Sequence, residues 1–147
     1  MNKILQILML LIFTAFTNSF AQMTPVGLWQ SVDDNTNEAR SEIKIIEVAG
    51  VFSGKVIRTL NEEPNDKKIC TDCKDDRKGQ VIVGMEIIRG LKQEGTEFVW
   101  AGGGKILDPE NGKEYTVRMT PIEGGKKLQV RGYIGPFYRT QVWNRIQ

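Results

Sequence analysis

Short runs of β-branched and aromatic residues, separated by turn-forming residues, constrain the fold of this 147-residue chain more than any other feature. Between residues 40 and 48, apolar Ile43 and Ile45 flank charged Lys44, which is the period of a strand with one buried face. An early strand is expected around Gly27. Later runs of strand character cover residues 51–60, 81–91, 97–107, 113–120, 126–134 and 138–146.

Glycine-containing turns fall between most of these runs, as at Gly50, Gly95, Gly112 and Gly124. Hairpin turns need residues that tolerate a positive φ, so the pattern indicates successive antiparallel strands. Short links favour a closed up-and-down barrel over a sandwich, whose crossing connections are longer. The sequence therefore predicts a single all-β domain, an eight-stranded antiparallel up-and-down barrel. Such a barrel is filled by side chains or holds one small ligand.

The first 21 residues are typical of a secretory signal peptide. One cation, Lys3, precedes an apolar run from Ile4 to Phe16, and small Ser19 and Ala21 follow at the spacing of a cleavage site. The apolar run is shorter than the roughly 20 residues that a membrane helix needs, so no transmembrane segment is expected. We expect residues 1–21 to be removed near Ala21, and residues 22–147 to form the barrel in the periplasm or outside the cell.

The charge and composition of the chain exclude several function classes. It carries 20 basic and 18 acidic residues, and the two signs are interspersed, so no footprint for nucleic acid is expected. The sequence contains no histidine, which removes the Ser-His-Asp and Cys-His nucleophile systems. No motif indicates a cofactor, and we expect a protein that is not an enzyme.

Cys70 and Cys73 are the two cysteines of the chain, and they lie in a run of charged residues. A zinc site would have to recruit Asp72, Asp75 or Asp76, an unusual donor set for structural zinc. A redox pair of the thioredoxin type normally begins a helix, and no helical pattern follows here. An oxidising compartment favours a structural disulfide between Cys70 and Cys73, with redox exchange and metal binding as the alternatives.

Gly27 and Trp29 in the first strand, with Arg145 near the end of the last, are similar to the glycine-x-tryptophan signature of lipocalin-type barrels. There the tryptophan plugs the closed end and the arginine lies across its ring. A longer series of motifs resembles the bacterial secreted family catalogued as domain of unknown function 2147. The series is GLW at 27–29, GKV at 54–56, CTDC at 70–73, WAGG at 100–103, DPENGKEY at 108–115, VRGYIG at 130–135 and RTQVWNR at 139–145. This resemblance implies an exported lipocalin-like barrel and supplies no established chemistry.

The last two expected strands each carry a polar and aromatic face. By period-2 alternation, Arg131 and Tyr133 share one face of the strand at 126–134. One face of the strand at 138–146 is shared by Arg139, Gln141, Trp143 and Arg145. If these faces point inward, they line the barrel for an anionic or amphipathic small molecule.

If they point outward, they form a solvated stripe, and the core is filled by Leu128, Val130, Thr140 and Val142. Charge normally faces water, which favours the outward interpretation for most of them. Gly132, Gly135 and Pro136 bend the chain between the two strands. We therefore expect Tyr133, Arg139 and Trp143 near the open mouth of the barrel, with at least one of them lining a pocket.

These observations lead to a functional hypothesis, an exported non-enzymatic carrier for a small amphipathic ligand. The candidate ligand-binding residues are Trp100, Arg131, Tyr133, Arg139 and Trp143. One alternative is a cell-envelope module with a filled barrel that contacts a protein partner. Another is a hydrolase that uses carboxylates at the barrel mouth.

Overall fold

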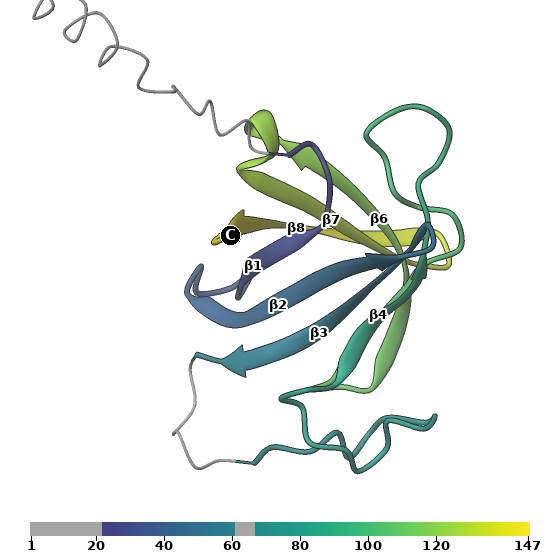
Figure 1. Cartoon of the computed structure of the whole chain (residues 1–147). Helices are drawn as coiled ribbons and strands as arrows, with labels where there is room; N and C mark the ends of the chain where they lie inside the picture. The colour runs from purple at the N-terminus through teal and green to yellow at the C-terminus, as the bar shows by residue number, and fades with distance from the viewer. Residues whose placement is uncertain (1–21, 61–66) are drawn as a thin grey trace, which may run out of the picture.

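Eight antiparallel strands close into a barrel in the computed structural model, which describes residues 22–60 and 67–147 (Figure 1). The strands are β1 (Gly27–Val32), β2 (Ala39–Val48), β3 (Val51–Thr59), β4 (Glu86–Leu91), β5 (Lys105–Asp108), β6 (Lys113–Ile122), β7 (Lys127–Ile134) and β8 (Phe137–Arg145). Each pairs with the next, and β8 returns to β1. The predicted all-β up-and-down barrel is confirmed, while the predicted signal peptide lies outside the described residues.

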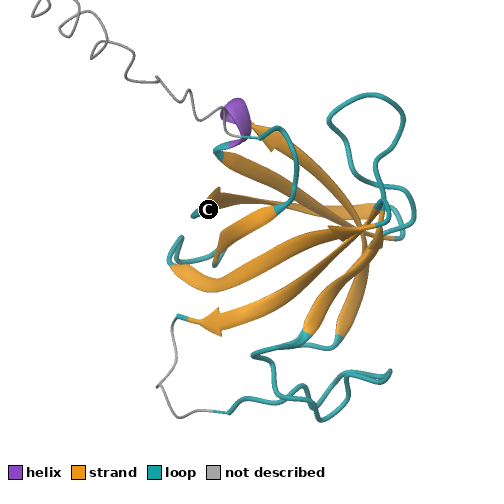
Figure 2. Cartoon of the chain, viewed as in Figure 1, coloured by secondary structure: helices purple, strands orange, loops and turns teal. Residues whose placement is uncertain are grey.

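Helical structure is almost absent from the part of the chain that the structure describes. A short 3₁₀ turn at Glu123–Gly125 joins β6 to β7, and the other connections are loops (Figure 2). No helix among these residues is long and apolar enough to cross a membrane.

Two predicted strands are shorter than the sequence indicated. The run at 81–91 becomes a strand only at Glu86, because its first residues belong to the cysteine loop, where the Ile82 amide donates to the Lys68 carbonyl at 2.9 Å. The run at 97–107 becomes a strand only at Lys105. There Gly104 turns the chain so close to Leu91 that an added Cβ would lie 2.8 Å from the Leu91 Cα.

Trp29 fills the closed end of the barrel. Its side chain is fully buried, and its indole N–H donates to the carbonyl of Pro25 at 2.7 Å. The indole needs this acceptor because an unpaired N–H in an apolar core is costly. The guanidinium of Arg145 lies 4.1 Å from the centre of the Trp29 ring, so the contact expected from the sequence signature is present.

Arg145 also ties the two ends of the domain together. Its guanidinium donates to the carbonyl oxygens of Gln22, Thr24, Val26 and Gly125 at 2.5 to 3.0 Å. Burial lowers the pKa of this arginine. The carbonyl dipoles and the Trp29 ring replace the water that the cation loses.

Gly27 is required beneath this arginine. A Cβ at position 27 would lie 2.5 Å from Arg145 Nη1, and the φ of Gly27 is +148°, which favours glycine. The glycine, the tryptophan and the arginine of the signature therefore form one packing unit.

We predict that Trp29→Ala lowers the free energy of unfolding by about 3 to 5 kcal/mol, because it removes a buried aromatic side chain and leaves a cavity. Urea unfolding followed by circular dichroism measures the change. Ile46→Ala, on the exposed outer face of β2, is the control and should change the midpoint little. An unchanged midpoint for Trp29→Ala would contradict the role of this residue as the plug.

Candidate ligand-binding site

A cavity of about 240 Å³ lies inside the barrel at the end opposite Trp29. Its apolar lining consists of Val32, Ile43, Val56, Ile82, Ile87, Ile106, Leu107, Pro109, Val130 and Trp143. Its polar lining includes Ser31, Ser41, Thr59, Tyr115 and Gln141, and charged residues at its mouth are Asp33, Arg40, Lys68, Asp108, Glu110 and Arg139. The barrel is therefore closed and filled at one end and hollow at the other.

The walls of the cavity differ in polarity. The neighbouring strands β8, β1 and β2 contribute Gln141, Ser31 and Ser41. The strands β3, β4 and β5 contribute mainly apolar side chains, namely Val56, Ile87, Ile106 and Leu107, with Thr59 and Asp108 as their polar lining residues. This division suits a molecule that has both a polar and an apolar surface.

The β7–β8 hairpin decides which side chains enter the cavity. Ile134 pairs with Phe137 across the two-residue link, so Gly132 pairs with Arg139. Paired residues share a face of the sheet, so even-numbered positions of β7 match odd-numbered positions of β8. The inward odd-numbered residues of β8 are Arg139, Gln141 and Trp143.

The interpretation that this face of β8 points to solvent is therefore wrong. Trp143 is buried and lines the cavity, whereas Val142 is exposed. The same register turns Arg131 and Tyr133 to the outside of the barrel. Arg131 donates to the Thr140 hydroxyl at 2.9 Å and stacks on an outer tyrosine ring, and Tyr133 packs against the same ring.

Of the predicted ligand-binding residues, Arg139 and Trp143 line the cavity and the other three do not. Trp100 lies in the filled part of the barrel, with its ring edge-to-face against Phe52 at 5.9 Å between centroids. Trp143 was expected near the mouth, but it is buried and lies deeper in the cavity. Its indole N–H donates to the side-chain oxygen of Gln141 at 2.9 Å.

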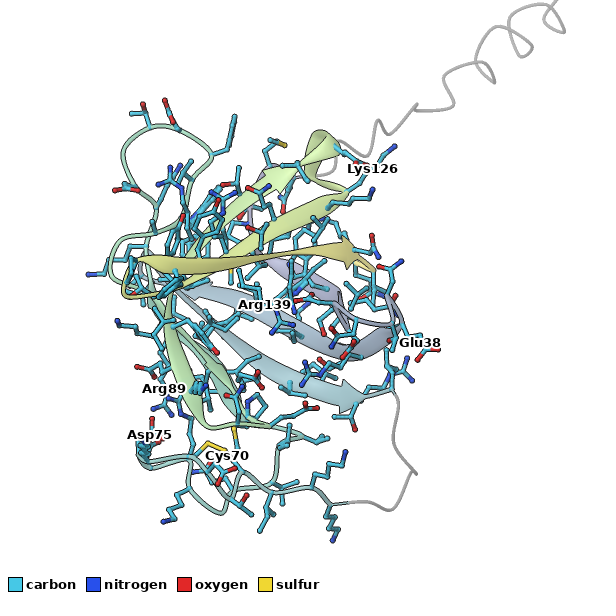
Figure 3. All side chains as sticks on the ribbon, turned by 180° about the vertical axis from the view of Figure 1, so that it is seen from behind. Glu38, Cys70, Asp75, Arg89, Lys126 and Arg139 are labelled. Carbon is cyan, nitrogen blue, oxygen red and sulfur yellow. A yellow bond between two sulfur atoms is a disulfide. The ribbon has the colours of Figure 1, made fainter. Side chains whose placement is uncertain are left out.

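Two arginines at the mouth differ in how they are paired. Arg40 forms ion pairs with Glu110 and with Asp108. Burial alone would lower the Arg40 pKa, but the hydrogen bond that Arg40 donates to Glu110 and the nearby carboxylates raise this pKa overall. Arg139 pairs with Asp34 in the β1–β2 loop and keeps about half of its side chain exposed. Figure 3 shows Arg139 between β8 and β2.

Asp33 is a carboxylate at the mouth that is unsuited to acid catalysis. It accepts hydrogen bonds from the backbone amides of Thr36 and Asn35, at 3.0 and 2.8 Å. These bonds stabilise the anion and lower the Asp33 pKa. A general acid at neutral pH needs the opposite shift.

The cysteine loop, residues 67–85, is part of the site. Cys70 and Cys73 are joined by a disulfide, with their Cα atoms 5.5 Å apart, so the predicted pairing is present. Ile82 of this loop is buried and lines the cavity, and Lys68 lies at the mouth. Ile82 was expected in the strand at 81–91, so it was not predicted as a lining residue.

Two arginines hold the cysteine loop against the barrel. Arg77, whose side chain is buried, donates to Asp75 and to Glu114 of β6, with a 2.7 Å bond to Glu114. Arg89 of β4 forms two hydrogen bonds with Asp76, at 2.8 and 2.9 Å. Figure 3 shows Cys70, Asp75 and Arg89 at the same end of the barrel.

Asp75 and Asp76, which could have joined the cysteines in a metal site, are thus engaged by arginines. Within residues 22–60 and 67–147, no group of three histidine, cysteine or acidic side chains is arranged to hold a metal ion.

Residues 27–145 match the model of a family described as "Uncharacterized protein conserved in bacteria (DUF2147)". The chain belongs to this family. A solved structure similar to this DUF2147 protein is protein HP1028 from the human pathogen Helicobacter pylori, which is described as belonging to the lipocalin family.

The two share 19% sequence identity over 86% of this chain and 85% of the other, with a TM-score of 0.71. The DUF2147 protein therefore has a lipocalin-like fold. No curated protein matches its sequence.

We predict that acid releases the cysteine loop through Asp75. The hydrogen bonds from Arg77 lower the Asp75 pKa from its ordinary 3.8 to about 2. The stabilisation is therefore complete above pH 3.8 and is lost as pH falls toward 2.

Asp75→Asn should remove this dependence, so the variant should lose less stability than the wild type over that interval. Thermal melting at a series of pH values measures the difference. Asp72→Asn, on the same loop, is the control, and its melting temperature should fall with pH as steeply as that of the wild type. An equally steep fall for the wild type and Asp75→Asn would contradict the prediction.

Proposed function

We propose that this protein is an exported, non-enzymatic barrel that binds a small amphipathic molecule with an acidic head group. The observation that carries the proposal is the partly apolar cavity with Arg139 at its mouth. A carboxylate can replace Asp34 on Arg139 through charge-assisted hydrogen bonds. The apolar part of the ligand then lies against residues such as Val56 and Ile87.

The volume of the cavity limits the size of the ligand. A cavity of about 240 Å³ that opens at the mouth suits one small molecule, and a long chain would extend through the mouth.

Export is supported by two features of the chain. The predicted signal peptide, residues 1–21, directs secretion. The disulfide between Cys70 and Cys73 suits an oxidising compartment such as the periplasm.

Binding without catalysis is supported by the chemistry of the mouth. The sequence has no histidine to serve as a proton shuttle. Asp33 has a lowered pKa, and Arg40 is paired with Glu110. These features give less support to a carboxylate-dependent hydrolase. Neither a cofactor nor nucleic acid is part of the proposal.

A second candidate function, contact with a cell-envelope protein, is favoured by the tip of the β7–β8 hairpin. Phe137 and Tyr138 are 73% and 63% exposed, and the neighbouring Ile134 is 48% exposed. Clustered apolar side chains of this kind are common in protein interfaces. The hollow interior supports ligand binding over a role that needs a filled barrel.

We predict that decanoate binds saturably and that Arg139→Met weakens its binding about tenfold, because the head group loses its cationic partner. Isothermal titration calorimetry of the mature domain measures the affinity. Arg131→Met is the matched control, since Arg131 is on the outer face of the neighbouring strand. Asp34→Asn should strengthen binding, because it frees Arg139.

Two results would refute the proposal. One is the absence of saturable binding by the wild type. The other is an equal loss of affinity in Arg139→Met and Arg131→Met.

A further inference from the structure

We infer that Gln141, with Ser31 and Ser41, forms a second polar subsite inside the cavity that receives a carbonyl or hydroxyl oxygen on the ligand chain. The preferred ligand is then an acid of medium length that carries an oxygen substituent, and not a plain saturated acid. This inference rests on the proposed function, because it names the ligand class for the same cavity.

The amide of Gln141 has a fixed orientation. The indole N–H of Trp143 is a donor only, so the amide atom 2.9 Å from it must be the oxygen. The amide NH₂ group therefore points away from Trp143. No described residue accepts a hydrogen bond from this group, and Gln141 lines the cavity.

The serine pair supplies a further polar group on the same wall. The Ser31 and Ser41 hydroxyl oxygens lie 2.7 Å apart, and the Ser31 oxygen is 3.3 Å from the Ser41 carbonyl oxygen. If Ser31 donates to the Ser41 carbonyl, Ser41 donates to Ser31 and its oxygen can accept a proton from a ligand hydroxyl. If Ser31 donates to the Ser41 hydroxyl instead, the Ser41 proton can be donated to a ligand oxygen. Ser31 is 5% exposed, so its polar group is buried in the wall.

Arg139 and Gln141 are spaced so that they can contact successive parts of one ligand. They are two residues apart on one face of β8, so their Cα atoms are roughly 7 Å apart. An acid held by Arg139 passes Gln141 on its way toward Trp143. A saturated chain would cover the Gln141 donor without pairing it, which carries a desolvation cost. An oxygen at the right carbon removes that cost.

A purely structural role for Gln141 is the rival explanation, in which its oxygen only orients the Trp143 ring. That role would change the affinity for every ligand by a similar factor. The subsite instead changes the ratio of affinities between an oxygenated acid and its parent. The ratio is therefore the quantity to measure.

The probes are decanoic acid and the five decanoic acids that carry one ketone at carbon 4, 5, 6, 7 or 8, titrated into the mature domain by calorimetry. At least one ketone acid should bind the wild type about two- to tenfold more tightly than decanoic acid. Gln141→Met should bring that ratio to about one. Thr140→Val, on the outer face of the same strand, should keep the wild-type ratio.

A second variant separates the two roles of the side chain. Gln141→Glu keeps an acceptor for Trp143 but offers no N–H donor, so its ratio should also fall to one or below. If thermal melting shows that Gln141→Met does not fold, Gln141→Glu serves as the test variant in its place.

The inference is overturned if decanoic acid binds saturably and no ketone acid binds more tightly, or if the advantage persists in Gln141→Met or Gln141→Glu. Either result leaves the proposed function standing. Absence of saturable binding by all six acids would refute the proposed function and the subsite together.

Discussion

The barrel closes through a short junction between β1 and β8, which fixes where its interior is filled and where it is hollow. Among the described residues these strands pair at two positions, Trp29 with Arg145 and Gln30 with Asn144. The stacked arginine, its carbonyl acceptors and the buried tryptophan reinforce this junction. Beyond it β8 pairs with β7 alone, and the interior is hollow. Arg139 and Asp34 join the two sides near the mouth.

Polar contacts of the cysteine loop position an apolar side chain in the wall of the cavity. The disulfide fixes a small turn, and the bonds of Arg77 and Arg89 hold that turn on β4 and β6. Gly112 allows close contact, since a Cβ there would lie 2.1 Å from the Asp72 carbonyl oxygen. With the loop held in this way, Ile82 is directed into the cavity.

Much of the fold followed from local sequence, because strand alternation and turn glycines act over a few residues. Which face of β8 points inward relative to β7 could also have been predicted from the sequence. The two-residue link at Gly135 and Pro136 pairs Gly132 with Arg139, so Arg131 and Arg139 lie on opposite faces of the sheet. The short β5 and the inward position of Ile82 depend on contacts between distant segments, such as the contact of Gly104 with Leu91. Period-2 patterns carry no information about such contacts.

Methyl NMR of isoleucine-labelled protein would show whether an acidic amphiphile enters the hollow end of the barrel. On addition of decanoate, we expect shifts in the δ1-methyl signals of the cavity residues Ile43, Ile82, Ile87 and Ile106. We expect little change for the exposed residues Ile46, Ile57, Ile134 and Ile146. Shifts confined to the exposed set, or no shifts at saturating decanoate, would contradict ligand binding inside the barrel.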